Sequence, residues 1–551
     1  MFRRVSAVLL LLSFALPAPA LPPATAPKVA KAANKPTKKT PKPRTISTKE
    51  LAKRVDKYLT DPAIQRGFWG IHVIDAATGK TLYEQNADRL FTPASNTKLF
   101  TTVTAMATLG PNYKAETSIE TNGVLEPTRQ LKGDLILVGR GDPNISGRVI
   151  PYHLKTERVP PHLRPLEQLA DTLVGAGLKQ VEGDVIGDDS LFAFERYGEG
   201  WGQDDLMWSD GAPASALTVN DNTIFLTIAP GNVGEPAKIT VDPDVQYYEI
   251  VNKVTTIAVG TGKRDIGINR EPGSRTLSIW GSIPADDQGL GEGLAIDDPA
   301  EYAAIAFRDM LVKRGVTITG KERAQHKLTS ELPIYALDVD KASQAQQHEQ
   351  HGGSTETAPA VSTTPRTVLA KLESRPFSDD LVVINKISQN LHAEIALRAA
   401  GHARGAPASL EGALAAEQHF LESIGISKDE FRFYDGSGMS AHNVVSPRAI
   451  TKLLQWTANQ PWGDQFRASL PVAGLDGSLD DRFRSSVANG RIWAKTGTLT
   501  HVNALSGYAE TESGRKLIFA VLVNNHRLTS SGAKKVIDHV LELLIDDQTG
   551  R

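Results

Sequence analysis

Three short motifs, far apart in the chain, constrain this sequence more than any other feature. They are, in chain order, Ser95-x-x-Lys98, Ser388-x-Asn390 and Lys495-Thr496-Gly497. A serine hydroxyl is a weak nucleophile at neutral pH and needs a nearby base to take its proton. A lysine three residues further along a helix lies on the same face as the serine and within its reach. The three motifs together predict an enzyme that is acylated on Ser95.

The sequence around Ser95 predicts where its hydroxyl lies. Pro93 precedes a run that is typical of a helix as far as Leu109, and Gly110 follows as its C-terminal cap. Ser95 is therefore expected at the N-terminus of this helix. Backbone N–H groups at a helix N-terminus have no intrahelical partner and can stabilise a developing oxyanion.

Strand patterns near the two ends of the chain predict one shared sheet. The N-terminal pair, 68–75 and 81–84, is typical of a hairpin. Near the C-terminus, the apolar segment 491–494 is followed by two further strands, 502–510 and 516–524. We expect these five segments to form one antiparallel sheet.

Two amphipathic helices are predicted at the ends of the folded chain. Ser47 and Glu50 form a capping-box pattern before an apolar stripe, and the last helix has an apolar face from Val536 to Leu544. We expect both helices on one face of the sheet and the Ser95 helix on the other. The result is an α/β sandwich built from distant parts of the sequence.

The third motif suits an edge strand beside the nucleophile. There, Lys495 and the hydroxyl groups of Thr496 and Thr498 can bind a substrate carboxylate through charge-assisted hydrogen bonds. Gly497 allows close approach of the backbone because it has no side chain.

The middle of the chain is predicted to be an insertion. Lys98 and Ser388 are 290 positions apart, far more than a connection within one domain needs, and strand-like runs recur between them. The predicted division is a signal peptide at 1–20, a Pro/Lys-rich tether at 21–46, a catalytic domain at 47–111 and 366–548, an inserted domain at 112–221 and 284–337, a nested, mostly β domain at 222–283, and a low-complexity loop at 338–365.

The N-terminus has the pattern of a secretory signal peptide. Arg3 and Arg4 precede the apolar run 5–16, and small residues at Ala18 and Ala20 are typical of a cleavage site. A membrane anchor is the alternative, but this run is shorter than the ~20 residues that span a bilayer. We therefore expect a periplasmic or otherwise extracytoplasmic protein without an integral span after signal removal.

Composition narrows the partners and the chemistry. The tether is basic and reads as disordered; the alternative is that it contacts an anionic membrane or cell-wall polymer. The net charge of −2 gives no reason to expect nucleic acid. Zero cysteines exclude a thiol nucleophile, disulfides and a Cys-ligated metal. His348 and His351 lie in the low-complexity loop, which we interpret as mobile and not as a metal site, so neither a metal nor a cofactor is expected.

The flanking segments extend a family resemblance over most of residues 47–548. The chain resembles the low-molecular-mass class C penicillin-binding proteins, the D-alanyl-D-alanine carboxypeptidase/endopeptidase family. The resemblance implies a β-lactamase/DD-peptidase-like α/β sandwich, an antiparallel sheet flanked by helices, with two inserted and largely β-containing domains. The tether and the loop are not part of the pattern. The matching segments are 92–98, 139–143, 183–185, 188–192, 200–201, 212–217, 435–440 and 471–477.

The resemblance, combined with the chemistry, implies roles for the motif residues. Ser95 attacks the carbonyl between two D-residues, and a neutral Lys98 is the general base. Ser388 relays a proton to the leaving amine, and Asn390 positions Lys98 and the substrate amide. Lys495 polarises this relay and, with Thr496 and Thr498, binds the terminal carboxylate. The N–H groups of Ser95 and Thr498 form the oxyanion hole.

The same resemblance implies the ligands. The substrates are peptidoglycan stem peptides, and β-lactam antibiotics act as inhibitors because they acylate the same serine. Asp188 is a candidate contact for the free amine of a stem-peptide diamino acid, with a solvated loop aspartate as the alternative. Ser437 and Ser440 are interpreted as structural, and Trp201 and Trp208 as core or domain-interface residues.

Two other functions stay open at this point. A β-lactamase shares the fold and the acylation chemistry but deacylates the drug quickly. A catalytically silent peptidoglycan-binding scaffold is disfavoured because Ser95, Lys98, Ser388, Asn390 and Lys495 are all present. The sequence leaves open the balance between carboxypeptidase and endopeptidase activity, the third stem-peptide residue and the oligomeric state.

Overall fold

The computed structural model describes residues 47–149, 159–332 and 365–547. The predicted signal peptide and tether, and all of the predicted loop except residue 365, lie outside the described residues, as do His348 and His351. No helix within the described ranges is long and apolar enough to cross a membrane.

The two ends of the chain combine into one five-stranded antiparallel sheet, which confirms the sequence prediction. The strand order is β2-β1-β24-β23-β22. The strands are β1 (Phe68–Asp75), β2 (Thr81–Gln85), β22 (Ile492–Leu499), β23 (Val502–Glu510) and β24 (Lys516–Asn524). Because β1 pairs directly with β24, the N-terminal hairpin and the C-terminal strands fold as one unit.

Alternation along these strands separates two apolar cores. Helices α1 (Thr48–Leu59) and α11 (Ser530–Ile545) cover one face and pack with Ile71 and Val521. Helix α2 (Thr97–Leu109) lies on the other face, in a core that includes Leu522. Successive strand residues point to opposite faces, so a continuous apolar run such as β24 serves both cores.

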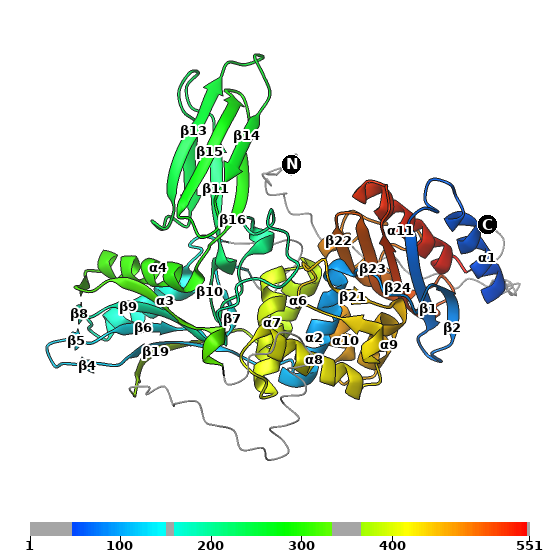
Figure 1. Ribbon diagram of the computed structural model, residues 1–551, viewed down its shortest axis with the longest axis horizontal. Helices are drawn as coiled ribbons and strands as arrows, with labels where there is room; N and C mark the ends of the chain where they lie inside the picture. The colour runs from blue at the N-terminus through cyan, green and yellow to red at the C-terminus, as the bar shows by residue number, and fades with distance from the viewer. Residues whose placement is uncertain (1–46, 150–158, 333–364, 548–551) are drawn as a thin grey trace, which may run out of the picture. The chain divides into compact units, whose positions relative to one another are not determined.

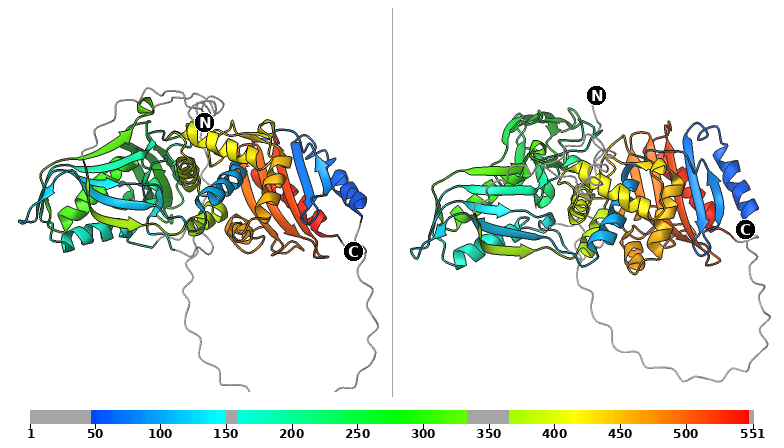
Figure 2. Two further views of the ribbon diagram at one scale, coloured as in Figure 1. Left: turned by 90° about the horizontal axis from the view of Figure 1, so that it is seen from below. Right: turned by 60° about the horizontal axis from the view of Figure 1, so that its bottom comes forward.

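Helix α2 is surrounded by other helices and is buried on all sides over Thr97–Met106. The surrounding helices are α6 (Phe377–Lys386), α7 (Asn390–Ala403), α8 (Leu410–Ser423), α9 (Pro447–Ala458) and α10 (Gly463–Ser469). Figure 2 shows α2 in blue beside the yellow helices α7 and α8. The helix ends at Leu109, and Gly110 follows with a φ of 80°, as predicted. Tight packing on every side fixes the turn that carries Ser95.

The described residues in the middle of the chain form two larger sheets and three smaller ones. One five-stranded sheet has the order β18-β9-β6-β3-β19, and a four-stranded sheet has the order β17-β8-β5-β4. Their strands are β3 (Glu116–Thr121), β4 (Val124–Leu125), β5 (Gln130–Lys132), β6 (Leu135–Val138), β8 (Gln180–Glu182), β9 (Val185–Ala193), β17 (Thr317–Ile318), β18 (Glu322–Lys327) and β19 (Thr367–Glu373). Helices α3 (Arg164–Gly175) and α4 (Pro299–Lys313) belong to the same core.

The smaller sheets have the orders β12-β11-β16, β13-β15-β14 and β10-β7. Their strands are β7 (Asp142–Ile145), β10 (Leu217–Val219), β11 (Thr223–Ala229), β12 (Lys238–Asp242), β13 (Glu249–Ile257), β14 (Asp265–Asn269), β15 (Thr276–Pro284) and β16 (Leu290–Ala295). A two-stranded sheet elsewhere joins β20 (Phe431–Arg432) to β21 (Val444–Val445).

Strand pairing runs across two of the predicted domain limits. Strand β16 falls in the segment 284–337 but pairs with β11 of the nested segment. Strand β19 falls in the segment 366–548 but pairs with β3 of the inserted segment. The sequence carries no local signal for either pairing, since the partners are far apart in the chain. The domain division as a whole stays a prediction.

A histidine joins three elements of the inserted region. On β18, Nδ1 of His326 lies 2.8 Å from Asp189 of β9, and Nε2 lies 3.2 Å from Asp298, the N-cap of α4. The ring also stacks on Phe194. Burial lowers the pKa of His326, but the two carboxylates outweigh burial and raise the pKa to about 10.

Replacing His326 by alanine is expected to lower the free energy of unfolding by about 2 kcal/mol at pH 6, because two charge-assisted hydrogen bonds are lost. A raised pKa stabilises the fold fully below the unfolded value of 6.5, and this stabilisation disappears as pH rises through about 10. Urea denaturation at pH 6 and pH 9.5 should therefore show a smaller difference at the higher pH. The exposed His402→Ala variant serves as the control. An equal difference at both pH values would mean that His326 acts through packing alone.

Candidate active site

Ser95 lies in the single 3₁₀ turn Ala94–Asn96 that leads into α2. The turn begins with a φ of 48° at Ala94. It is in close contact with the loop that contains Gly438, where an added Cβ would lie 2.0 Å from the Ala94 carbonyl oxygen. Because Gly438 has a φ of 81° and no room for a side chain, only glycine fits there. The backbone that leads into Ser95 is therefore held in place by this loop.

The amine of Lys98 contacts three acceptors, although its side chain is fully buried. Its Nζ lies 3.1 Å from Ser95 Oγ and 2.6 Å from Asn390 Oδ1, and it also donates to the Ser437 carbonyl. The amide and carbonyl oxygens can only accept hydrogen bonds, so they use two N–H groups of the amine. In neutral Lys98 the remaining position is a lone pair, and it faces the Ser95 hydroxyl. The contacts thus orient a base toward the nucleophile.

Burial makes the neutral form of Lys98 accessible. It lowers the pKa of Lys98 to about 8, against the opposing charges of Asp435, Glu394 and Asp210. With a pKa of about 8, roughly a tenth of the amine is neutral at pH 7. A pKa close to the working pH is what a general base at neutral pH requires.

The second and third motifs meet at a second buried lysine. Lys495 Nζ donates to Ser388 Oγ at 2.7 Å and to the Thr496 carbonyl at 3.0 Å. Burial, and then the charge of Lys98, hold the pKa of Lys495 well below its usual value. Ser388 has a φ of 64°. A substrate carboxylate would favour the charged amine and raise the pKa again, because opposite charges attract strongly away from water.

The third motif lies on β22, an edge strand of the five-stranded sheet. Asn96 donates from Nδ2 to the Lys495 carbonyl at 3.0 Å and so ties this strand to the turn of Ser95. A Cβ at Gly497 would lie 2.6 Å from the Pro93 carbonyl oxygen, which fits the predicted close approach of the two backbones. The hydroxyl of Thr496 lies 2.7 Å from Ser478 Oγ, and Thr498 Oγ1 accepts from Asn503 at 3.3 Å.

A polar loop, 435–440, supports Lys98, a positioning role that the sequence did not indicate. Asp435 accepts from the N–H groups of Gly438 and Ser440 at 2.9 and 2.7 Å. Glu394 accepts from the N–H groups of Gly436 and Ser437 at 2.9 and 2.8 Å. These bonds aim the Ser437 carbonyl at Lys98. The sequence singled out the segment 435–440 by resemblance only. The available signal for Glu394 was its position four residues before Arg398 on an otherwise apolar helix, which allows an ion pair between the two.

Trp201 and Ser440 contribute to the structure of this loop behind Lys98. Trp201 donates from Nε1 to Asp435 at 2.9 Å, which ties a residue from the inserted segment to the loop behind Lys98. The side chain of Ser440 is buried and its hydroxyl accepts from the His442 N–H at 3.2 Å. Trp208 is partly buried against the core of the inserted region.

Asp188 does not contact the group of residues around Ser95 and Lys98. It is buried on β9, where it pairs with Arg366 at 2.6 Å and accepts from Gln325 at 3.3 Å and from the Ser190 N–H at 3.0 Å. These contacts lie within the sheet of the inserted region. The structure brings together Ser95, Lys98, Asn390, Ser388 and Lys495, with Asp188 outside that group of contacts.

A profile of the D-Ala-D-Ala carboxypeptidase 3 (S13) family matches residues 51–337 and 335–545. The chain belongs to this family. It is 31% identical over 488 residues to the D-alanyl-D-alanine carboxypeptidase of Actinomadura sp. (strain R39), a match that covers 87% of this chain and 81% of the relative. It is 25% identical over 449 residues to the D-alanyl-D-alanine carboxypeptidase DacB of Haemophilus influenzae, covering 80% of this chain and 82% of that protein.

Solved structures agree on the fold. The crystal structure of penicillin binding protein 4 from Haemophilus influenzae matches with a TM-score of 0.71 and 22% identity, over 91% of this chain and 98% of that one. The resemblance inferred from the motifs is confirmed, and so is the predicted fold class. As a member of the S13 family, the protein is a serine-type D-alanyl-D-alanine carboxypeptidase and a hydrolase.

Proposed function

We propose that the protein cleaves the peptide bond between two D-residues of peptidoglycan stem peptides through an ester on Ser95. The observation that carries the proposal is the Lys98 amine, buried and held by two acceptors so that its third position faces Ser95 Oγ. This is the arrangement of a serine nucleophile with its own base.

Acylation uses the first motif and the backbone around it. Ser95 Oγ attacks the carbonyl carbon while its proton passes to the neutral amine of Lys98. The N–H groups of Ser95 and Thr498 hold the oxyanion of the tetrahedral intermediate. Collapse of the intermediate breaks the C–N bond and leaves the acyl group on Ser95.

The second and third motifs serve the leaving group. Lys495 donates to the Ser388 hydroxyl, which in turn can give its proton to the departing amine, and the proton on Lys98 replenishes Ser388. Lys495, Thr496 and Thr498 bind the carboxylate of the terminal residue. Water then attacks the ester, with Lys98 again as the base, and regenerates Ser95. A carboxypeptidase substrate presents this terminal carboxylate, whereas an endopeptidase substrate need not, so binding of the carboxylate would favour carboxypeptidase activity.

Asp188 remains a proposed substrate contact, but a substrate amine would meet a carboxylate that is already paired. Its carboxylate already has the Arg366 guanidinium as a partner at 2.6 Å. A substrate ammonium would have to compete with Arg366 or displace it.

The location and the inhibitors are part of the same proposal. A secretory signal peptide at 1–20 would place the enzyme in the periplasm or outside the cytoplasm, where peptidoglycan lies, and the basic tether could contact the envelope. β-Lactams would acylate Ser95, since they present a strained amide beside a carboxylate. A second structure of the Haemophilus influenzae protein contains a β-lactam.

The test is the intact mass of the mature protein after brief exposure to benzylpenicillin, with Ser95→Ala alongside. We expect a persistent adduct of one penicillin in the native protein and none in the variant. A consumed drug without an adduct would indicate a β-lactamase. An intact drug without an adduct would contradict acylation on Ser95 and favour a silent scaffold.

A further inference from the structure

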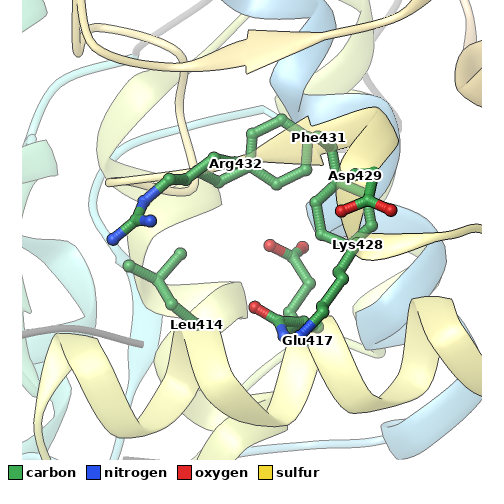
Figure 3. A pocket seen from close by; sticks show the side chains of 8 residues that line it. Leu414, Glu417, Lys428, Asp429, Phe431 and Arg432 are labelled. Atoms are coloured by element: carbon green, nitrogen blue, oxygen red, sulfur yellow. The ribbon is translucent and has the colours of Figure 1, made fainter. Parts of the chain in front are cut away.

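A cavity outside the active site is lined by a buried acid, Glu417. The cavity measures about 280 Å³ and lies between α8, the short turn 428–430 and β20. Its lining residues are Leu414, Glu417, Gln418, Lys428, Asp429, Phe431, Arg432 and Phe433. Figure 3 shows the Glu417 carboxyl group pointing into the space between Leu414, Phe431 and Arg432.

Glu417 is only 1% exposed, and within the described residues neither of its carboxyl oxygens has a hydrogen-bond partner. Buried carboxyl groups without a partner are costly and rare in folded proteins. Burial, and then the charges of Glu394 and Asp435, raise the pKa of Glu417 to about 8, although the nearby hydroxyl groups of Thr101 and Thr104 act in the opposite direction. A ligand that offers an ammonium group would supply the charge-assisted hydrogen bond that the protein does not.

The walls and the rim of the cavity restrict the ligand further. Phe431 and Phe433 form an aromatic wall that is fixed by Phe100 of α2, whose ring centroid lies 5.0 Å from that of Phe433. Lys428 and Arg432 are exposed at the rim, and neither forms an ion pair within the part of the chain that the structure describes. Asp429 is also exposed there. The cavity therefore has an acidic floor and a rim with one more cation than anion.

This arrangement of charge disfavours simple ions. A metal cation would meet only one buried carboxylate and a cationic rim, and the described residues hold no group of three potential metal ligands. An inorganic anion could pair only with the cations of the rim and would leave the buried Glu417 carboxyl group protonated. A small molecule with a cation at one end and an anion at the other satisfies both the floor and the rim.

We propose that this cavity binds a small free α-amino acid, with its ammonium group on Glu417 and its carboxylate directed to Lys428 and Arg432. The aromatic wall contacts the side chain of the ligand and favours a short apolar one such as that of alanine. The size of the cavity suits a ligand of a few non-hydrogen atoms.

The site is tested on protein whose active site is already occupied. The full chain is acylated with benzylpenicillin, the adduct is verified by mass, and D-alanine or L-alanine is added at about 10 mM, since so small a ligand binds at about millimolar strength. Saturation-transfer NMR reads the transfer from protein to the alanine methyl group, and a titration gives Kd. If acylation fails, the proposed function fails, and the titration is run on the Ser95→Ala variant without affecting the test of the cavity.

Glu417→Gln is expected to raise Kd by about ten- to a hundredfold, the loss of one hydrogen bond to a charged group. Asp464→Asn removes an exposed carboxylate of α10, away from the lining residues, and should leave Kd unchanged. Arg432→Gln alters only the exposed rim, cannot disturb the core, and should raise Kd severalfold. No transfer in the native protein, or an unchanged Kd in both Glu417→Gln and Arg432→Gln, would overturn the proposal.

Discussion

Replacing Lys98 by methionine is expected to lower the rate constant of acylation by benzylpenicillin by about 10²- to 10⁴-fold, the usual contribution of a general base. Methionine has a similar length but no lone pair of comparable basicity, so Ser95 would keep its position and lose its proton acceptor. Stopped-flow kinetics or quenched mass spectrometry measures the rate. Lys535→Met, at an exposed lysine of α11, is the matched control and should react normally.

The pH dependence separates a base from a residue that only fills space. Since burial lowers the pKa of Lys98 to about 8, the neutral amine increases with pH up to that value and then levels off. The acylation rate should therefore rise about tenfold per pH unit below pH 7 and reach a plateau above pH 8. A rate that stays constant between pH 6 and pH 9 would contradict the role of Lys98 as the base.

The outer framework of the fold could be predicted because its signals are local. The turn at 76–80, the capping box at Ser47 and the glycine at 110 each mark a boundary by the backbone chemistry of a few residues. Strands β1 and β24 are continuous apolar runs, which is typical of strands buried on both faces. The order of the strands within the sheet was not predicted and comes from the pairing of β1 with β24.

The inserted region was predicted less well for a related reason. Strand β13 spans Glu249–Ile257, and its sequence marks it only weakly as a strand. Most of its residues are exposed or half-buried, so alternation between apolar and polar residues is weak. Pairings such as β3 with β19 depend on residues about 250 positions apart, and a segment alone holds no information on its partner.

The same contrast holds within the active site. The contact of Lys98 with Ser95 follows from helical spacing, whereas the relation of Lys495 to Ser388 was implied only by the family resemblance. The Ser437 carbonyl could not be foreseen, because any residue supplies a carbonyl and only the fold aims it. Glu394 was missed since a single acid in a helix is ordinarily a solvated one.

A second buried network joins the inserted region to the loop between Ser388 and Asn390. Asp221 is fully buried and pairs with Arg148, which is 1% exposed. It also lies 3.4 Å from Nε2 of His392 on α7 and accepts from Gln389 at 3.2 Å. Gln389 sits between the serine and the asparagine of the second motif. The network thus holds the second motif through Gln389.

Asp221→Ala is expected to lower the free energy of unfolding by about 3–5 kcal/mol, because it leaves two buried cations without this carboxylate. It should also slow acylation of Ser95, since Gln389 loses its acceptor. Urea denaturation and the penicillin rate measure the two effects, and the exposed Asp244→Ala is the control. A variant with native stability would mean that groups other than Asp221 stabilise the charges of Arg148 and His392.

The effect of Asp221→Ala should depend on pH in a way that identifies its partners. Burial lowers the pKa of His392, but Asp380 and Asp221 outweigh burial and raise it to about 8. The stabilisation from protonated His392 is complete below pH 6.5 and is lost as pH rises through about 8. The pair of Asp221 with Arg148 does not depend on His392. The difference between native protein and variant should therefore decrease between pH 6.5 and pH 9 but not vanish, and the part that remains measures the pair with Arg148.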